Sequence, residues 1–199
     1  FFSGVTADLD IKLPEPGHYG VAMVFLPQSD KARTTCEAEI ETAVKAQGMQ
    51  LLGWRDVPHR SSEIGILAQK VMPTIRQAFI SGISEIDSDK LERELYVARK
   101  VAENTVDSMI DHLSDDDRDT FYICSMSAQT IVYKGLFIAE QLAPFFPDLQ
   151  DQRLRTAFAL VHSRYSTNTL GAWKLAHPYR MLCHNGEINT VQGNKNWMR

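Results

Sequence analysis

The sequence has little of what marks several large classes of protein. It has three cysteines in 199 residues and no Cys-x-x-Cys pair, which disfavours a disulfide framework or a zinc site. No apolar run approaches the ~18–20 residues of a membrane span, and the first residues lack a secretion signal. Basic residues number 21 against 25 acidic ones, so no basic excess predicts binding to nucleic acid. We therefore expect a cytosolic protein with free thiols that binds neither membranes nor nucleic acid.

The composition is that of an ordinary folded domain, with 44% hydrophobic and 23% charged residues. The length fits one domain. The chain opens on Phe1-Phe2 without an initiator Met and closes on Trp197-Met198-Arg199, which is typical of the middle of a structured element. We expect a fragment of a longer polypeptide.

Strand and helix patterns alternate along the chain, and several connections are short enough for hairpins. This interleaving predicts an α+β fold with a largely antiparallel sheet. Apolar runs predict strands at 19–26, 49–54, 75–80, 121–126, 130–133 and 155–162, with 121–126 and 130–133 forming a hairpin. Helical spacing predicts helices at 29–46, 88–112 and 136–142, and a short one ending near residue 70.

The longest predicted helix carries one apolar stripe, and the acidic run that follows it has no metal-binding pattern. The stripe is too short and alanine-rich for a coiled coil, so we expect a helix that faces the core. Residues 115–119 lack the alternating ligands and the glycine of a calcium loop, which favours a solvated turn. The stripe consists of Leu91, Leu95, Ala98, Ala102, Thr105 and Met109.

Residues whose side chains could take part in catalysis or ligand binding gather in the last forty positions. His162, His177 and His184 lie 15 and 7 residues apart, which matches no metal-ligand pattern. Cys183 follows an apolar run at 179–182 that resembles a strand, so a buried structural thiol is favoured over a nucleophile.

The Asn185-Gly186 pair predicts a sharp turn, because both residues tolerate positive φ. Such a turn presents the asparagine side-chain amide and the glycine backbone N–H on one side, where together they can hold an oxyanion. A plain hairpin turn has the same sequence, and the pair alone leaves both interpretations open.

A second polar element follows the apolar run that ends at residue 162. Arg164 at the end of a strand can form a bidentate pair with a ligand carboxylate, and Thr167 can add a hydrogen bond to it. A surface ion pair is the alternative for a single arginine.

The order of these motifs resembles the amidotransferase domain of the glutamate synthase large subunit, and several are shared with class II glutamine amidotransferases in general. The resemblance covers nearly the whole chain. It rests on Pro16-Gly17-His18-Tyr19-Gly20-Val21, Phe121–Ser127, Thr130–Gly135, Ala159–Thr169, His184–Thr190 and Gly193–Arg199, the last of which points to glutamate synthase.

The resemblance implies a four-layer αββα fold of the N-terminal-nucleophile hydrolases and the hydrolysis of L-glutamine to glutamate and ammonia. It implies that Arg164 binds the glutamine α-carboxylate with Thr167 beside it, and that Asn185 (side chain) and Gly186 (backbone) form the oxyanion hole. For the parent enzyme it implies FMN, an iron–sulfur cluster, reductive amination of 2-oxoglutarate, and a small NAD(P)H-oxidising subunit or ferredoxin as electron donor. The parent is expected in the cytoplasm, or in a plastid if its source is photosynthetic.

The chain departs from this family at its start. The family's nucleophile is a cysteine with a free α-amine, whereas residue 1 is Phe, and none of Cys36, Cys124 and Cys183 can supply both groups. We expect residues 1–199 to be a partial domain, without the nucleophile segment, the C-terminal part, a metal or a cofactor. It is expected to be inactive and, with sheet edges unpaired, marginally stable. The alternatives are a natural truncated module that binds glutamine or docks on a partner, and another class II amidotransferase.

Overall fold

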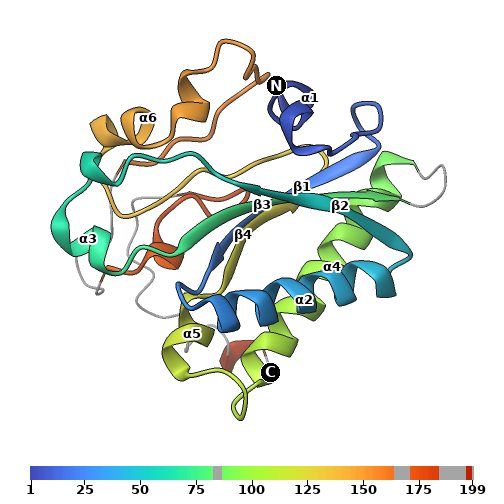
Figure 1. The fold of residues 1–199 in the computed structure, drawn as a ribbon, viewed down its shortest axis with the longest axis horizontal. Helices are drawn as coiled ribbons and strands as arrows, with labels where there is room; N and C mark the ends of the chain where they lie inside the picture. The colour runs from blue at the N-terminus through green and yellow to red at the C-terminus, as the bar shows by residue number, and fades with distance from the viewer. Residues whose placement is uncertain (83–86, 164–170, 184–195, 199) are drawn as a thin grey trace.

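Four antiparallel strands form the centre of the molecule in the computed structural model, which describes residues 1–82, 87–163, 171–183 and 196–198 (Figure 1). The order of the strands across the sheet is β2-β3-β1-β4. The strands are β1 (Tyr19–Leu26), β2 (Met49–Asp56), β3 (Thr74–Gly82) and β4 (Tyr122–Ser127).

Strand β1, one of the two inner strands, contributes buried side chains to both faces of the sheet. Every residue after Tyr19 is buried, because β1 pairs with β3 on one side and with β4 on the other. Its side chains alternate between the faces, as the strand period requires. Val24 belongs to the hydrophobic cluster beneath the two long helices, whereas Met23 and Phe25 belong to the cluster on the opposite face.

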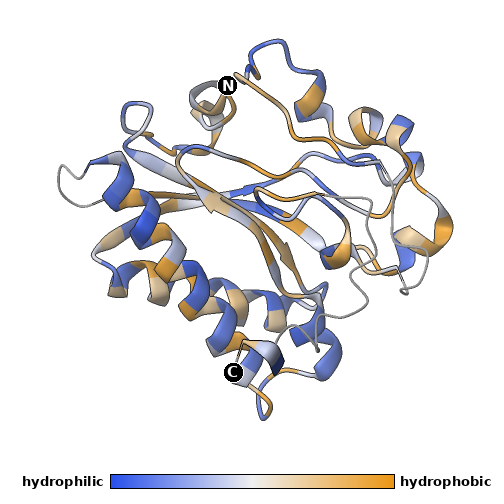
Figure 2. Ribbon diagram, turned by 180° about the vertical axis from the view of Figure 1, so that it is seen from behind, coloured by the Kyte–Doolittle hydropathy of each residue, from blue (hydrophilic) through white to orange (hydrophobic). Residues whose placement is uncertain are grey.

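Two long helices, α2 (Asp30–Ala46) and α4 (Ser88–Ser108), cover one face of the sheet (Figure 1). In Figure 2 their hydrophobic residues form stripes along otherwise hydrophilic helices. The predicted stripe of α4 is confirmed at its buried positions, and Asp87 caps the helix by accepting a hydrogen bond from the Lys90 backbone N–H (2.8 Å). The buried residues of the stripe are Leu91, Leu95, Ala98 and Ala102.

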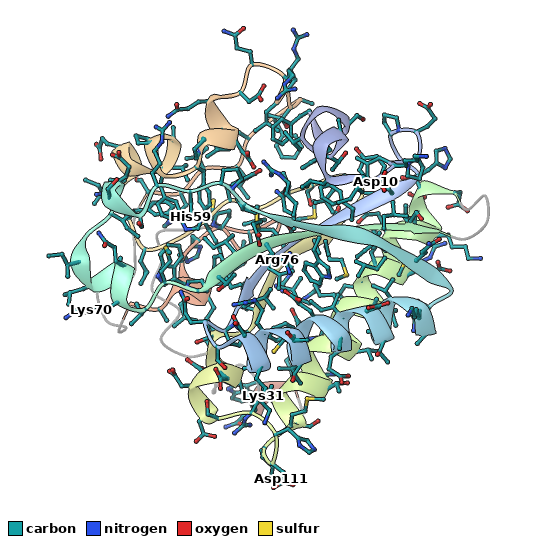
Figure 3. All side chains as sticks on the ribbon, in the orientation of Figure 1. Asp10, Lys31, His59, Lys70, Arg76 and Asp111 are labelled. Carbon is teal, nitrogen blue, oxygen red and sulfur yellow. The ribbon has the colours of Figure 1, made fainter. Side chains whose placement is uncertain are left out.

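A charged side chain also lies between the sheet and α2. Arg76 of β3 donates to Glu37 of α2 (2.6 Å), and its Nε lies 2.7 Å from an Asp56 carboxylate oxygen. Figure 3 shows Arg76 near the middle of the molecule, whereas Lys70 and Asp111 lie at its rim. The pairing joins the helix layer to the edge strand β2.

The opposite face of the sheet is covered by short helices and irregular chain. An aromatic cluster packs there, in which Phe145 and Phe146 are fully buried and Trp173 meets Phe25 edge to face, with ring centroids 5.8 Å apart. The remaining helices are α1 (Phe2–Val5), α3 (Ile66–Lys70), α5 (Asp115–Thr120), α6 (Leu142–Phe145) and the 3-10 helices η1 (Ala7–Leu9), η2 (Ser61–Glu63), η3 (Ala139–Gln141), η4 (Pro147–Gln150) and η5 (Trp173–Leu175).

The predicted α+β class and antiparallel sheet are confirmed, but the predicted hairpin partner at 130–133 is wrong. The Ser127 hydroxyl accepts from the backbone N–H groups of Gln129 and Thr130, each at 3.0 Å, and turns the chain away from β4. Further along, the Val132 N–H donates to the Ser125 hydroxyl (3.1 Å) rather than to a strand carbonyl. Hydroxyl groups therefore replace the ladder bonds that a fifth strand would need.

Other local predictions need correction. Residues 155–162 form no strand, and Phe158 and Val161 are each 69% exposed, since no neighbouring strand pairs with them in the described ranges. Residues 179–182 form a turn closed by one bridge between Tyr179 and Leu182, not a strand. The acidic run predicted as a turn is helix α5, capped by the Ser114 hydroxyl. The long helix ends at residue 108 rather than 112, and the helix predicted at 136–142 is η3 followed by α6.

Candidate active site

The four residues predicted to bind and activate substrate lie outside the described residues. They are Arg164, Thr167, Asn185 and Gly186. The structure does describe the chain that leads into each motif, residues 155–163 before Arg164 and residues 171–183 before Asn185.

These two leading segments lie against each other. The Cys183 thiol donates to the backbone carbonyl of Val161 at a sulfur–oxygen distance of 3.8 Å. One residue further along, the His162 ring stacks on His177 with a centroid separation of 4.5 Å, and His177 contacts the Tyr179 ring at the same separation. The two segments therefore touch within three residues of each motif, at Val161 and at Cys183.

A cavity of about 430 Å³ opens beside both segments. Its lining comes from the N-terminal leader and β1, from residues 127–133, from residues 154–156 and 158–160, and from Pro178 and Arg180. The volume is within the range of ligand pockets. Apolar side chains such as Phe2, Val21 and Leu160 line it together with polar groups from Thr130 and Arg155.

The segment that precedes Asn185, residues 173–182, is held by hydrogen bonds to α3, α4 and β4. At its start, the Trp173 indole N–H donates to the Ala68 carbonyl (3.1 Å). Near its end, one guanidinium nitrogen of Arg180, Nη2, lies 3.0 Å from both a Glu103 carboxylate oxygen of α4 and the Ile123 carbonyl of β4. Arg180 adopts a left-handed backbone conformation with φ of 52°, so the turn is bent around this anchored side chain.

Between these anchors lies a buried lysine. The side chain of Lys134 is 2% exposed, and its Nζ donates to the Lys174 carbonyl (2.8 Å). Burial lowers the pKa of this amine to about 8, because the charged form loses its hydration.

A second buried polar network joins the cavity wall to the sheet. The guanidinium of Arg55 binds both carboxylate oxygens of Asp148, and one of these oxygens also accepts from the Tyr133 hydroxyl (2.9 Å). Gln77 completes the network by donating to the Tyr133 oxygen (3.2 Å). Burial is the main cause that raises the pKa of Tyr133, so this cavity-lining phenol stays neutral at physiological pH.

Comparison with known proteins shows which family this arrangement belongs to. The profile of the class-II glutamine amidotransferases matches residues 1–199. The chain belongs to the class-II glutamine amidotransferases.

Among curated relatives, the chain resembles the large chains of glutamate synthases. It is 50% identical over 192 residues to the glutamate synthase [NADPH] large chain of Bacillus subtilis, covering 96% of this chain and 12% of that protein. It is 45% identical to the ferredoxin-dependent chloroplastic glutamate synthase of Oryza sativa, and 45% identical to the glutamate synthase [NADPH] large chain of Azospirillum brasilense. In both cases 90% of this chain and 11% of the relative are covered, so the chain spans about a ninth to an eighth of these relatives.

The three cysteines differ in their surroundings. Burial raises the pKa of the thiols of Cys36 and Cys124 to about 12, so neither forms a thiolate near neutral pH. They lie in separate hydrophobic clusters, one on each face of the sheet. Cys183 was predicted to be buried in a strand, but it is only half-buried and lies after the turn at 179–182. The correction follows from the missing strand, since no sheet covers the thiol in the described part of the chain.

The sequence patterns did not single out four charged residues that the structure shows to be buried or anchored. They are Lys134, Arg180, Arg55 and Asp148. One signal in the sequence points to Lys134, which lies between the apolar runs 131–133 and 136–138. Arg55 and Asp148 lie 93 residues apart, so no local pattern connects them. Among the described residues, no three His, Cys, Asp or Glu side chains come together as a metal site, and no helix has the length and hydrophobicity to cross a membrane.

Proposed function

We propose that residues 1–199 are part of the glutaminase domain of a glutamate synthase and carry its carboxylate-binding and oxyanion motifs. In this proposal Arg164 pairs with the α-carboxylate of L-glutamine, and Thr167 adds a hydrogen bond. The side-chain amide of Asn185 and the backbone N–H of Gly186 stabilise the oxyanion that forms on the glutamine side-chain carbonyl.

The observation that carries the proposal is the contact between the two leading segments. Because Cys183 and Val161 touch and His162 stacks on His177, the chain enters both motifs from one place, beside the 430 Å³ cavity. A substrate held at its carboxylate by one motif and at its amide by the other needs this proximity. The similarity to relatives named as glutamate synthases supports the same assignment.

The reaction proceeds by acyl transfer through a thioester. A cysteine thiol attacks the side-chain carbonyl carbon of glutamine, the oxyanion collapses, and ammonia leaves after accepting a proton. Water then hydrolyses the thioester to glutamate and regenerates the thiol. In the complete enzyme the ammonia is used for reductive amination of 2-oxoglutarate, with NADPH, NADH or ferredoxin as the source of electrons.

We infer that the nucleophilic cysteine is none of the three in residues 1–199. Cys36 and Cys124 are buried neutral thiols, and none of the three cysteines carries a free α-amine. We therefore expect residues 1–199, expressed alone, to hydrolyse no glutamine. An iron–sulfur cluster cannot be held by Cys36 and Cys124 together, because they lie on opposite faces of the sheet.

The test is glutaminase activity in the complete natural polypeptide, measured as ammonia and glutamate released from L-glutamine. Arg164→Gln removes the carboxylate partner and is expected to raise KM by about 10- to 100-fold, since a charge-assisted bidentate pair is lost. Asn185→Ala removes one oxyanion donor and is expected to lower kcat by about 10²- to 10³-fold.

Two exposed positions give matched controls. Arg153→Gln removes an arginine that pairs with Asp151 at the surface, and Asn104→Ala removes an asparagine from the outer face of α4. Both are expected to leave KM and kcat unchanged. If the wild-type protein binds glutamine and releases no ammonia, the binding-module alternative replaces the glutaminase assignment.

A further inference from the structure

The amine of Lys134 is buried where few hydrogen-bond acceptors surround it. Its three N–H donors face one strong acceptor, the Lys174 carbonyl at 2.8 Å. The rings of Tyr122 and Tyr179 add cation–π contacts at 4.3 and 4.9 Å from Nζ. Among the described residues, Lys134 forms no ion pair with a carboxylate.

The titratable and charged groups around Lys134 do not offset the cost of burying its ammonium charge. On β4, Tyr122 and the Cys124 thiol face it, and burial raises the pKa of each to about 12. On the segment above it, Arg180 carries a second positive charge against the Tyr122 ring and repels the ammonium. The two nearby carboxylates are engaged elsewhere, Glu103 of α4 with Arg180 and Asp119 of α5 with the Lys174 side chain.

The buried state of Lys134 depends on segment 173–182. This segment supplies the Lys174 carbonyl and the Tyr179 ring, so its departure exposes the amine to water. A solvated lysine has a pKa of about 10.4, against about 8 beneath the segment. Docking of the segment therefore releases a proton wherever the pH lies between these two values.

The sign of the pH dependence follows from this difference. The undocked form binds more protons between pH 8 and 10.4, so docking becomes more favourable as the pH rises through that range. Below pH 8 both forms are protonated, and the docked segment bears the full cost of the buried ammonium. Tyr122 and Cys124 remain neutral throughout, so neither accounts for the change.

We propose that Lys134 is a positioning residue that acts as a pH-sensitive latch: segment 173–182 docks firmly over the neutral amine and loosens when the amine is protonated. The segment ends three positions before Asn185, so the latch is proposed to act on the chain that leads into the oxyanion motif. The consequence for turnover rests on the proposed glutaminase function, whereas the docking equilibrium does not.

The docking equilibrium is tested by hydrogen exchange of peptides from 173–182 in the complete polypeptide, corrected for intrinsic exchange rates. Lys134→Met keeps the length of the side chain and never carries a charge. At pH 7 the wild-type segment is expected to exchange faster than in Lys134→Met, by up to about 100-fold. The difference is expected to shrink about tenfold by pH 9, while Lys134→Met itself shows no such dependence.

Two further variants complete the design. Lys134→Arg keeps a permanent charge, so its segment is expected to exchange fast at both pH values. Asp119→Asn breaks the Lys174 side-chain pair on the same segment and is expected to change exchange equally at pH 7 and pH 9. If Lys134→Met exchanges as fast as the wild type or faster at pH 7, the ammonium holds the segment instead of straining it, and the latch is overturned.

Turnover gives a separate readout. Lys134→Arg is expected to lower the glutaminase kcat by 3-fold or more with KM unchanged, because Arg164 lies on the other leading segment, and Lys134→Met is expected to retain kcat. Equal kcat values in the two variants would contradict the positioning role. A wild-type protein without glutaminase activity would refute the proposed function, and the exchange experiment would still decide the latch.

Discussion

Arg55 of β2 and Asp148 of η4 form a bidentate ion pair, with both nitrogen–oxygen distances at 2.7 Å. The side chains are only 7% and 5% exposed. Gln77 accepts from the same guanidinium nitrogen (2.8 Å), so the pair joins two strands of the sheet to the chain that covers it. Burial alone would lower the pKa of Arg55, but the hydrogen bonds and charge of Asp148 together with Tyr133 outweigh it, and the pKa is raised.

Breaking this pair on one side is expected to destabilise the domain by about 3–5 kcal/mol, because the remaining charge stays buried without its partner. Arg55→Met and Asp148→Leu are the variants, and native-state hydrogen exchange of peptides from β2 and from 142–150 measures the loss. The double variant Arg55→Met, Asp148→Leu is expected to cost less than either single change. A double variant that costs the sum of both would show that the two side chains act independently.

Two glycines allow close packing and are expected to tolerate no side chain. A Cβ on Gly20 of β1 would lie 2.5 Å from a Leu95 methyl group of α4, and one on Gly135 would lie 2.5 Å from the Trp173 ring. Gly20→Ala and Gly135→Ala are expected to cost about 1–3 kcal/mol of stability each. Gly65→Ala is the control, since nothing lies within 4 Å of its Cβ position. Thermal unfolding of the three variants measures the difference, and equal melting temperatures would refute the packing argument.

The three thiols are expected to react with iodoacetamide in a defined order. Cys183 is half-buried and is expected to react first, at pH 8. Cys36 and Cys124 are buried neutral thiols whose pKa is raised to about 12 by burial, so their thiolate fraction at pH 8 is about 10⁻⁴. Their alkylation in the folded protein is expected to rise about tenfold for each pH unit up to unfolding.

Peptide mass spectrometry after timed alkylation distinguishes the three sites. Alkylation in urea gives the matched control, in which all three cysteines are expected to react at similar rates. Faster reaction of Cys124 than of Cys183 in the folded protein would contradict the described burial of these thiols.

Local patterns in the sequence predicted the centre of the fold well. The eight residues of β1 form an uninterrupted apolar run, and the apolar stripe of α4 repeats every three or four residues. Short stretches of sequence were therefore enough to predict which of these residues are buried. The order of the strands was not predictable in this way, because pairing of β1 with β3 and β4 depends on contacts between distant residues. The predicted strand at 130–133 was wrong because the hydroxyls of Ser125 and Ser127 compete with the strand ladder, an effect that apolar periodicity does not register.

Some parts of the candidate site were also predicted from the sequence, whereas others required the folded structure. Arg164, Thr167, Asn185 and Gly186 came from a resemblance between motifs and remain predictions, since they lie outside the described residues. The contact between the segments that lead to them joins positions 22 residues apart and needs the folded chain. The position of Lys134 between two apolar runs was a signal that pattern reasoning did not use, and its burial depends on Lys174, 40 residues further on.

Arg180 also lies against β4, at one edge of the sheet. In the described part of the chain β4 is an outer strand, and an outer strand with free carbonyl groups is a template on which another chain can add a strand. By donating to the Ile123 carbonyl, Arg180 places a charged group over this edge, which an incoming strand would have to displace. We expect release of segment 173–182 to uncover this edge for pairing with another strand, so the contacts that hold the segment also cover a surface prone to self-association.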